Sequence, residues 1–323
     1  MSYYKIGKRF LRTVTVTAFT PIAYTIVNNV DMMSWFPKMV IIRKELIKNC
    51  FNSNIEIPKT GLKYVEHPVL EQDIHNCINN EQGGVKIVWA PPGTGKTTSV
   101  RHVISEELKL GNISGVLMVT PPRMSVEPDE WFRHQFKFFG IETLTQNEQL
   151  STLIDNDFKK PFVIVIDQCD NFDFDDKLRR FIKVLAEDSN VTKKYVVLAI
   201  CTDASKAATM REWNGGVKIK LVNNKYNSYK WSLPQIEKWV EHHIKNHDMI
   251  NRENNVSHYN KFIKAATVAG TADFLITNSY PIEHKNIHQI EDSWVATSKY
   301  LGQIWESGQL LSSKKKCWYW PWS

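Results

Sequence analysis

The sequence predicts an α/β fold in which helices flank a largely parallel sheet, and three observations support this prediction. Beyond residue 69, short apolar runs alternate with amphipathic stretches of helical length. A glycine-bearing loop joins one apolar run to a helical pattern within residues 85–108. Another apolar run, at residues 161–166, is continuous and ends in an aspartate. Such a run is typical of a strand that is buried on both faces.

Composition places the chain among packed globular proteins. Of its 323 residues, 42% are hydrophobic and 23% are charged, which excludes disordered, collagen-like and coiled-coil chains. The five cysteines form no Cys-x-x-Cys pair, so neither a zinc ribbon nor a disulfide framework is indicated. We expect free thiols in an intracellular, reducing compartment.

The net charge of +7 is unevenly distributed along the chain. Residues 1–50 carry +6, residues 312–323 carry +3, and the part between them carries −2. A near-neutral body with two basic ends favours contacts through the ends over a broad nucleic-acid-binding face. Nucleic acid is therefore a partner that the charge distribution does not favour.

Residues 13–30 form an uncharged stretch of eighteen positions after a basic, acid-poor start. Its length is just sufficient to span a membrane, although five threonines and Pro21 weaken that interpretation. An organelle-targeting sequence is a second interpretation. The third is an ordinary strand and helix packed on the body of the protein.

The strongest motif is a phosphate-binding loop between an apolar run at residues 85–89 and a helical pattern at residues 99–108. Two glycines let the backbone curl so that its N–H groups point at phosphate oxygens, next to the N-terminus of the following helix. The loop, called the P-loop below, has the predicted nucleotide-binding residues Ala90, Pro91, Pro92, Gly93, Thr94, Gly95, Lys96, Thr97 and Thr98.

Individual roles within the P-loop follow from side-chain chemistry. We expect Lys96 to reach the β- and γ-phosphates of ATP and the Thr97 hydroxyl to bind Mg²⁺. The motif departs from its usual pattern at Ala90, where the first glycine is expected. Alanine is the mildest substitution there, provided that the backbone does not require a positive φ.

A second motif supplies the acidic partner of the P-loop. The apolar run at residues 161–166 leads into Asp167, which we expect to lie beside the P-loop and to hold Mg²⁺ directly or through water. Together with the preceding P-loop, this order of elements indicates a Walker B strand.

These two motifs resemble those of the AAA+ ATPases and the related STAND signalling ATPases, and the resemblance covers about residues 65–280. It implies that residues 195–203 form the sensor-1 strand, with Thr202 or Asp203 facing the γ-phosphate or the attacking water. Residues 217–222 would be the last strand. Residues 232–240 resemble the start of a helical lid, and residues 265–275 the small-residue turn before the last lid helix.

The expected architecture is therefore a P-loop NTPase parallel sheet flanked by helices, AAA+-like, followed by a small helical lid. The four predicted segments are the basic N-terminal segment at 1–64, the ATPase core at 65–225, the lid at 226–311 and the tail at 312–323. The cofactors implied by the resemblance are ATP and Mg²⁺.

The sequence departs from the AAA+ pattern at the residue that follows the Walker B aspartate. That residue is usually glutamate and is Gln168 here; glutamine positions water without accepting a proton. Asp170 is a candidate for the missing carboxylate, and the alternative is that it caps the following helix. Slow and vigorous hydrolysis are both compatible with these residues.

Arginines are the second departure. The turn at residues 270–274 contains no sensor-2 arginine. Arg211 lies where an AAA+ arginine finger would project to a neighbouring subunit, and the alternative is that it compensates a helix dipole. A homo-oligomer is thus one expected assembly.

The tail at residues 312–323 sets three lysines beside four large aromatic residues. Association with a membrane surface, stacking on single-stranded nucleic acid and docking into a groove of the body are its three interpretations. Membrane association is thus an expectation for both ends of the chain.

Three hypotheses for biological role stay open: an oligomeric enzyme that remodels protein or nucleic acid, a slowly hydrolysing nucleotide switch, and a replication helicase. The near-neutral body disfavours the helicase.

Overall fold

The computed structural model describes part of the chain, which divides into two compact units at residues 1–48 and 49–323. All of the described residues belong to the second unit: 51, 64–79, 83–122, 127–137, 154, 158–172, 176–212, 219–222, 229–243, 255–278 and 286–313. Residues 13–30 and 314–323 lie outside them, so the interpretations of both ends stay predictions. No helix of the described part has the length and apolar character needed to cross a membrane.

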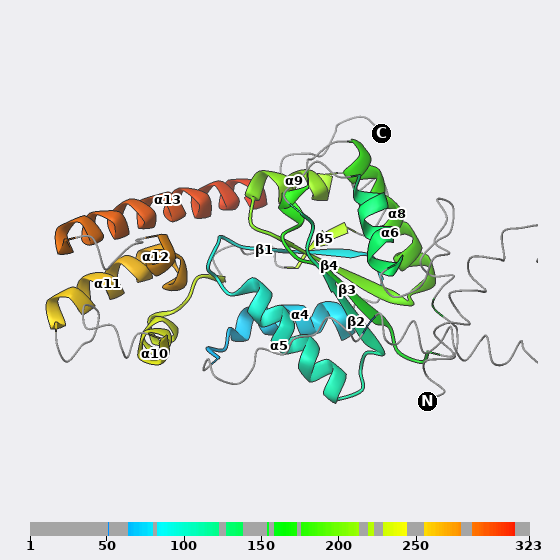
Figure 1. Ribbon diagram of the computed structural model, residues 1–323, viewed down its shortest axis with the longest axis horizontal. Coiled ribbons are helices and arrows are strands. Elements are labelled where there is room, and N and C mark those ends of the chain that lie inside the picture. The colour runs from blue at the N-terminus through cyan, green and yellow to red at the C-terminus, as the bar shows by residue number, and fades with distance from the viewer. Residues whose placement is uncertain are drawn as a thin grey trace, which may run out of the picture. The chain divides into compact units, whose positions relative to one another are not determined.

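Five parallel strands form the predicted sheet, in the spatial order β2–β3–β4–β1–β5 (Figure 1). Their bounds are β1 Val85–Trp89, β2 Gly115–Val119, β3 Phe162–Ile166, β4 Tyr195–Cys201 and β5 Ile219–Leu221. The register sets Ile166 of β3 opposite Ala199 of β4, and Trp89 of β1 opposite Cys201 of β4. The carboxyl ends of β1, β3 and β4 therefore meet at one edge of the sheet.

Helices on both faces explain why the inner strands lack polar alternation. Every residue of β1, β3 and β4 is buried, because each face of these strands packs on helices. On one face lie α4 (Pro68–Asn79) and α5 (Lys96–Lys109), and on the other lie α6 (Pro128–Lys137), α8 (Asp176–Thr192) and α9 (Ala204–Glu212) (Figure 1). The short edge strand β5 is less buried.

The lid consists of α10 (Leu233–His243), α11 (Val256–Ala269), α12 (Asp273–Asn278) and the long α13 (Ile287–Ser313). Trp294 and Trp305 of α13 are almost completely buried. Trp294 packs edge-on against Phe262 of α11, and the Trp305 indole donates a hydrogen bond of 3.1 Å to the Ala269 carbonyl. Helix α13 also contacts α9 of the core, so lid and core share an interface.

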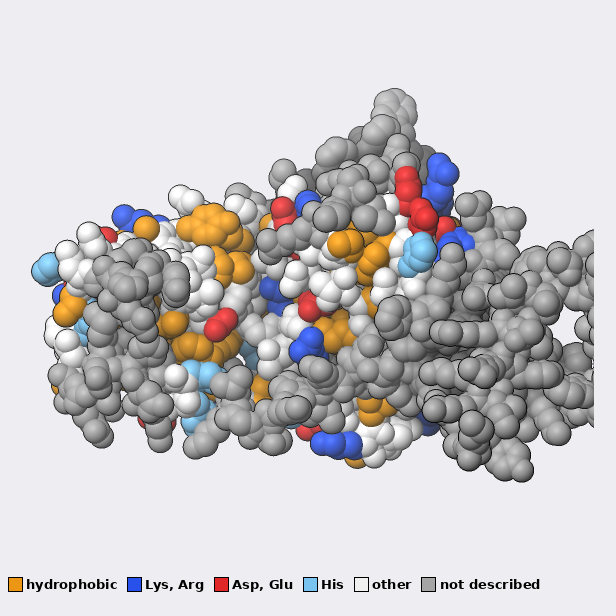
Figure 2. All heavy atoms as spheres, in the orientation of Figure 1, with side chains coloured by type: hydrophobic (Ala, Val, Ile, Leu, Met, Phe, Trp, Pro, Cys, Tyr) orange, Lys and Arg blue, Asp and Glu red, His pale blue; other side chains and the backbone are white. Residues whose placement is uncertain are grey.

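Acidic and basic side chains are mixed on the surface that Figure 2 shows, and near α6 and α8 they lie side by side. Within the described part of this face there is no broad basic area of the kind that follows a nucleic-acid backbone. This agrees with the near-neutral charge of the middle of the sequence.

The predicted fold class is confirmed, and the differences concern the ends of elements. The helix expected at residues 99–108 begins earlier, at Lys96. The sensor-1 strand ends at Cys201, so Thr202 and Asp203 lie in the loop that follows it. The turn within residues 265–275 precedes the short α12 and not the last lid helix, which is α13.

The hydroxyl of Ser189 connects the end of α8 to two strands, and its removal is a test of this packing. It accepts a hydrogen bond of 2.8 Å from the Gly84 N–H and donates one of 2.6 Å to the Tyr195 carbonyl. Because Ser189 is fully buried, Ser189→Ala leaves polar backbone groups without this partner. We expect urea denaturation to show a loss of about 1–3 kcal/mol in the free energy of unfolding.

The matched control is Ser307→Ala, since the exposed Ser307 hydroxyl also donates to a backbone carbonyl, that of Gln303. Its expected effect is within about 0.5 kcal/mol. Equal losses in the two variants would contradict the role of Ser189.

Candidate nucleotide site

The P-loop adopts the curled conformation that its glycines predict. Gly93 and Gly95 have φ values of 74° and 82°, a region that favours glycine. Ala90 is not among the residues with positive φ, which explains why alanine is tolerated where the motif usually has glycine. Gly95 is the N-cap of α5, so the loop N–H groups lie at the positive end of that helix.

Lys96 is buried inside the P-loop, with 7% of its surface exposed. Its ammonium donates to the carbonyls of Ala90 at 2.6 Å and Pro91 at 2.9 Å. Burial lowers its pKa to about 8, and the nearby Asp170 and Asp167 carboxylates act in the opposite direction. Desolvation is larger than their attraction, because a buried ammonium loses its hydration.

Thr97 and Asp167 meet as the two motifs predict. The Thr97 hydroxyl donates to the Asp167 carboxylate at 2.9 Å, and Asp167 is buried at the end of β3. Hard oxygen ligands of this kind suit Mg²⁺, which usually takes few protein ligands and adds phosphate oxygens and water. Among the described residues, no group of three His, Cys, Asp or Glu side chains is arranged to hold a metal ion.

The remaining P-loop side chains differ in exposure. Thr94 is buried, and its hydroxyl donates to the Pro91 carbonyl at 2.8 Å, which stabilises the curl of the loop. Thr98 is exposed on the first turn of α5, and Pro92 is half-buried.

Gln168 turns toward the end of β2. Its backbone has φ 52° and ψ 46°, a left-handed conformation that is uncommon for residues other than glycine. Its side-chain oxygen accepts a hydrogen bond of 3.2 Å from Asn171, and the same Asn171 nitrogen donates to the Pro121 carbonyl at 3.0 Å. Pro121 follows β2 along the chain.

Asp170 is connected instead to the end of β4. Its carboxylate accepts a hydrogen bond of 3.2 Å from the Thr202 N–H, and its carbonyl accepts one of 2.6 Å from the Lys206 ammonium. This side-chain hydrogen bond leads to the loop after β4, whereas the residues immediately before α8 lie outside the described part, so the helix-capping alternative stays open. Asp203, in contrast, caps α9 by accepting from the Lys206 N–H at 2.9 Å.

The lid contacts the P-loop directly, which sequence reasoning did not predict in detail. The Trp231 indole donates to the Thr94 carbonyl at 3.0 Å, and the Thr271 hydroxyl donates to the Gly93 carbonyl. A Cβ atom on Gly93 would lie 2.5 Å from the Cβ of Phe274 in α12. Glycine is required here both for its φ and for this close approach. The small-residue turn thus lies at the P-loop.

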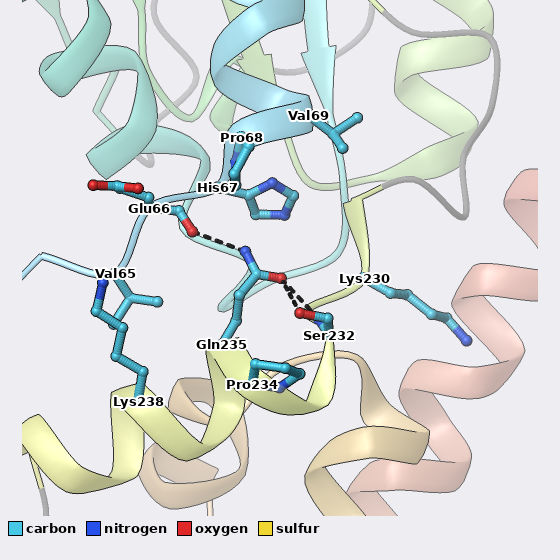
Figure 3. A pocket seen from close by; sticks show the side chains of 10 residues that line it. All are labelled: Val65, Glu66, His67, Pro68, Val69, Lys230, Ser232, Pro234, Gln235 and Lys238. Carbon is cyan, nitrogen blue, oxygen red and sulfur yellow. Dashed lines mark hydrogen bonds between the residues drawn. The ribbon is translucent and has the colours of Figure 1, made fainter.

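A pocket of about 440 Å³ adjoins this contact, between the segment before α4 and the start of α10 (Figure 3). Figure 3 shows Gln235 of α10 bridging the two sides, with its amide donating to the Glu66 carbonyl at 2.8 Å. Its side-chain oxygen accepts from the backbone and hydroxyl of Ser232. The pocket residues are Val65, Glu66, His67, Pro68, Val69, Lys230, Ser232, Pro234, Gln235 and Lys238.

Trp231, which contacts the P-loop, lies in the chain between the pocket residues Lys230 and Ser232. The Trp231 ring would be 3.8 Å from a Cβ atom on Gly95. Only the helical start at residues 232–240 pointed to this region in the sequence, because the pocket unites segments that are far apart along the chain.

The topology places Arg211 away from the residues of the P-loop. It lies in the last turn of α9, and α9 runs away from the sheet edge that carries the P-loop, since it begins after β4 and leads to β5. Arg211 is half-buried, and its role as a finger toward a neighbour or in dipole compensation stays a prediction.

Comparison with a protein-family model places the core. Residues 79–207 match the family described as an AAA domain. This segment is an AAA domain. The AAA+ P-loop ATPase core is thereby confirmed, with β1 to β4 and both Walker motifs inside the matched residues. A comparison with curated proteins found no match.

Solved structures give distant likenesses. A Walker-type ATPase of Pyrococcus abyssi is 10% identical with a TM-score of 0.41, over 79% of this chain and 77% of that one. PCH-2 of C. elegans is 13% identical with a TM-score of 0.37, over 72% and 66%. Drosophila ORC bound to DNA is 13% identical with a TM-score of 0.40, over 78% and 65%. This chain thus covers less than two thirds of the PCH-2 and ORC chains, and these likenesses carry no argument about function.

The lowered pKa of Lys96 predicts that nucleotide affinity depends on pH. Lys96 loses its charge as pH rises through about 8, and only the ammonium attracts phosphate. We therefore expect the affinity for a fluorescent ATP analogue to fall above that pH by up to about tenfold per pH unit. The control is Lys96→Arg, because a guanidinium stays charged over this range. A profile as flat in the natural protein as in this variant would contradict the prediction.

Proposed function

We propose that this chain binds ATP with Mg²⁺, hydrolyses it, and couples nucleotide state to the remodelling of a protein or nucleic-acid partner. The observation that supports the proposal best is the convergence of three groups at one sheet edge: the P-loop, the Lys96 ammonium and the Thr97–Asp167 pair. An AAA domain with this convergence is suited to phosphoryl chemistry.

Each group of the site would have a role in ATP binding that follows from its chemistry. Lys96 would exchange its bonds to two loop carbonyls for bonds to the β- and γ-phosphates. The loop N–H groups would bind the remaining phosphate oxygens. Bound Mg²⁺ would neutralise charge on the phosphates, held by Thr97 and Asp167. These groups are positioned before the ligand arrives, which lowers the cost of reorganisation.

The pocket beside Trp231 supports a nucleotide over a bare polyphosphate. Its volume of about 440 Å³ lies within the usual range for small ligands. Because its residues come from both the core and the lid, a base bound there would touch both parts. Nucleotide exchange would then change the contacts of the lid with Thr94 and Gly93, which is the basis of the proposed coupling.

The alternative is a nucleotide switch that binds ATP tightly and hydrolyses it slowly. Gln168 favours this alternative, because an amide cannot accept the proton of the attacking water. A helicase is less favoured, since the described face in Figure 2 has mixed charges.

Turnover and molecular mass, measured together with and without ATP, would separate these functions. An oligomer with steady turnover would support remodelling, and Arg211→Ala should then reduce turnover in the oligomer. A monomer that retains ADP would support the switch.

Lys96→Ala is expected to abolish ATP binding while the chain stays folded. The lost ammonium interacts with loop carbonyls and not with the apolar core. Equilibrium binding of ATP and the urea midpoint are the two measurements. A folded Lys96→Ala protein with unchanged ATP affinity would remove the assignment of the phosphate site.

Asp167→Asn is expected to retain ATP and to lose Mg²⁺-dependent hydrolysis. Asparagine keeps an oxygen that can accept from the Thr97 hydroxyl, but it lacks the charge that holds a divalent cation. Hydrolysis would be followed by phosphate release over a range of Mg²⁺ concentrations. A normal Mg²⁺ dependence in this variant would mean that another residue holds the cation.

A further inference from the structure

We propose that Asp170, and not Gln168, accepts the hydrogen bond of the attacking water, and that Asn171 holds Gln168 away from the phosphates. This inference rests on the proposed ATP hydrolysis. It assigns the role of the missing carboxylate to Asp170, which the sequence left open between that role and helix capping.

The Gln168 side chain is directed toward the loop that follows β2. The strand order is β2–β3–β4–β1–β5, so β2 and β1 are separated by two strands. The side-chain nitrogen of Asn171 donates both to the Gln168 side-chain oxygen and to the Pro121 carbonyl, which lies beyond the end of β2. Its left-handed backbone, with φ 52°, turns the side chain in this direction.

The same contacts determine which end of the Gln168 amide is engaged. A backbone carbonyl only accepts hydrogen bonds, so the Asn171 atom at 3.0 Å from the Pro121 oxygen must be its nitrogen. That nitrogen also contacts Gln168, and the Gln168 atom it meets must therefore be the oxygen. One acceptor position of the Gln168 oxygen is thus already engaged by Asn171, and the NH₂ group can only donate.

Asp170 is directed to the opposite side, toward the P-loop. Its carboxylate is bonded to the Thr202 N–H after β4, and β4 is the direct neighbour of β1. Its charge also reaches the Lys96 ammonium, where it counteracts the lowering of the pKa by burial. The Asp170 charge therefore favours the protonated form of the lysine that we expect to hold the γ-phosphate.

The turn that carries Asp170 is anchored on the same side. The Lys206 ammonium donates to the Asp170 carbonyl at 2.6 Å and to the Phe172 carbonyl at 3.4 Å. The carboxylate is thus held by its own side-chain bond and by a lysine from α9. A carboxylate has several acceptor positions, so the bond to Thr202 leaves capacity for a water molecule.

The step balances with water as the only co-reactant. The water oxygen forms a bond to the γ-phosphorus while the bond from that phosphorus to the bridging oxygen breaks. ADP leaves with the electron pair, and the proton of the water passes through Asp170 to solvent or phosphate. No oxidation or reduction occurs.

The experiment is single-turnover hydrolysis of ATP by the full chain in excess, together with ATP affinity for each variant. Asp170→Asn keeps an oxygen for the Thr202 N–H. We expect it to lower the rate by about a hundredfold or more, the scale of a lost general base, with ATP affinity within about threefold. Asp129→Asn removes an exposed carboxylate of α6 and is the control for charge.

Two further variants test the role of Gln168 itself. Gln168→Ala and Asn171→Ala should each change the rate by less than about threefold, a small effect beside the usual scale of a lost general base. Asn171→Ala also keeps the proposal testable if Asp170→Asn does not fold. A loss of about tenfold or more in either variant, with ATP still bound, would overturn the inference, because Gln168 or its orientation would then be required.

Two other results would count against the proposals separately. A rate in folded Asp170→Asn within about threefold of the natural one, or ATP binding without hydrolysis above the uncatalysed rate, would overturn the role of Asp170 and leave the nucleotide site standing. Absence of ATP binding in the natural protein would overturn the proposed function itself.

Discussion

The parallel alignment of β1, β4 and β3 is the constraint on which the candidate site depends. Parallel strands share the direction of their carboxyl ends, so the loops that follow them must meet at one sheet edge. The hydrogen bond between Thr97 and Asp167, residues 70 positions apart in the chain, is a direct result. If either strand ran in the opposite direction, the P-loop and the Walker B aspartate would lie at opposite edges.

Hydrogen bonds within the loop and hydrogen bonds from the lid both stabilise the P-loop. This arrangement determines which contacts a bound nucleotide would change. From within, Lys96 and Thr94 satisfy carbonyls of the loop. From the lid, Trp231 and Thr271 satisfy two more. Buried carbonyls without partners are costly, so lid and loop are energetically linked. In the proposed function, a bound phosphate would compete with the loop carbonyls for Lys96, and the lid contacts would respond.

Most elements of the core were predicted from the sequence, because local patterns determine them. The consecutive apolar residues at 85–89 and 161–166 were sufficient to predict two buried strands. The φ values of Gly93 and Gly95 follow from the lack of a side chain. The boundaries were less accurate: Thr202 and Asp203 lie after their strand, since strand pairing ends where β1 ends.

What the sequence by itself determined is the fold class, the P-loop and the order of the two Walker motifs, since each is a short-range pattern of apolar periodicity or turn-forming residues. Only the tertiary structure decided that Trp231 and Thr271 contact the P-loop, because no local pattern relates residues that are more than a hundred positions apart. It also separated Gln168 from Asp170. These residues are two positions apart, yet their hydrogen bonds lead to different neighbouring strands, and the order of strands in a sheet arises from packing over the whole chain.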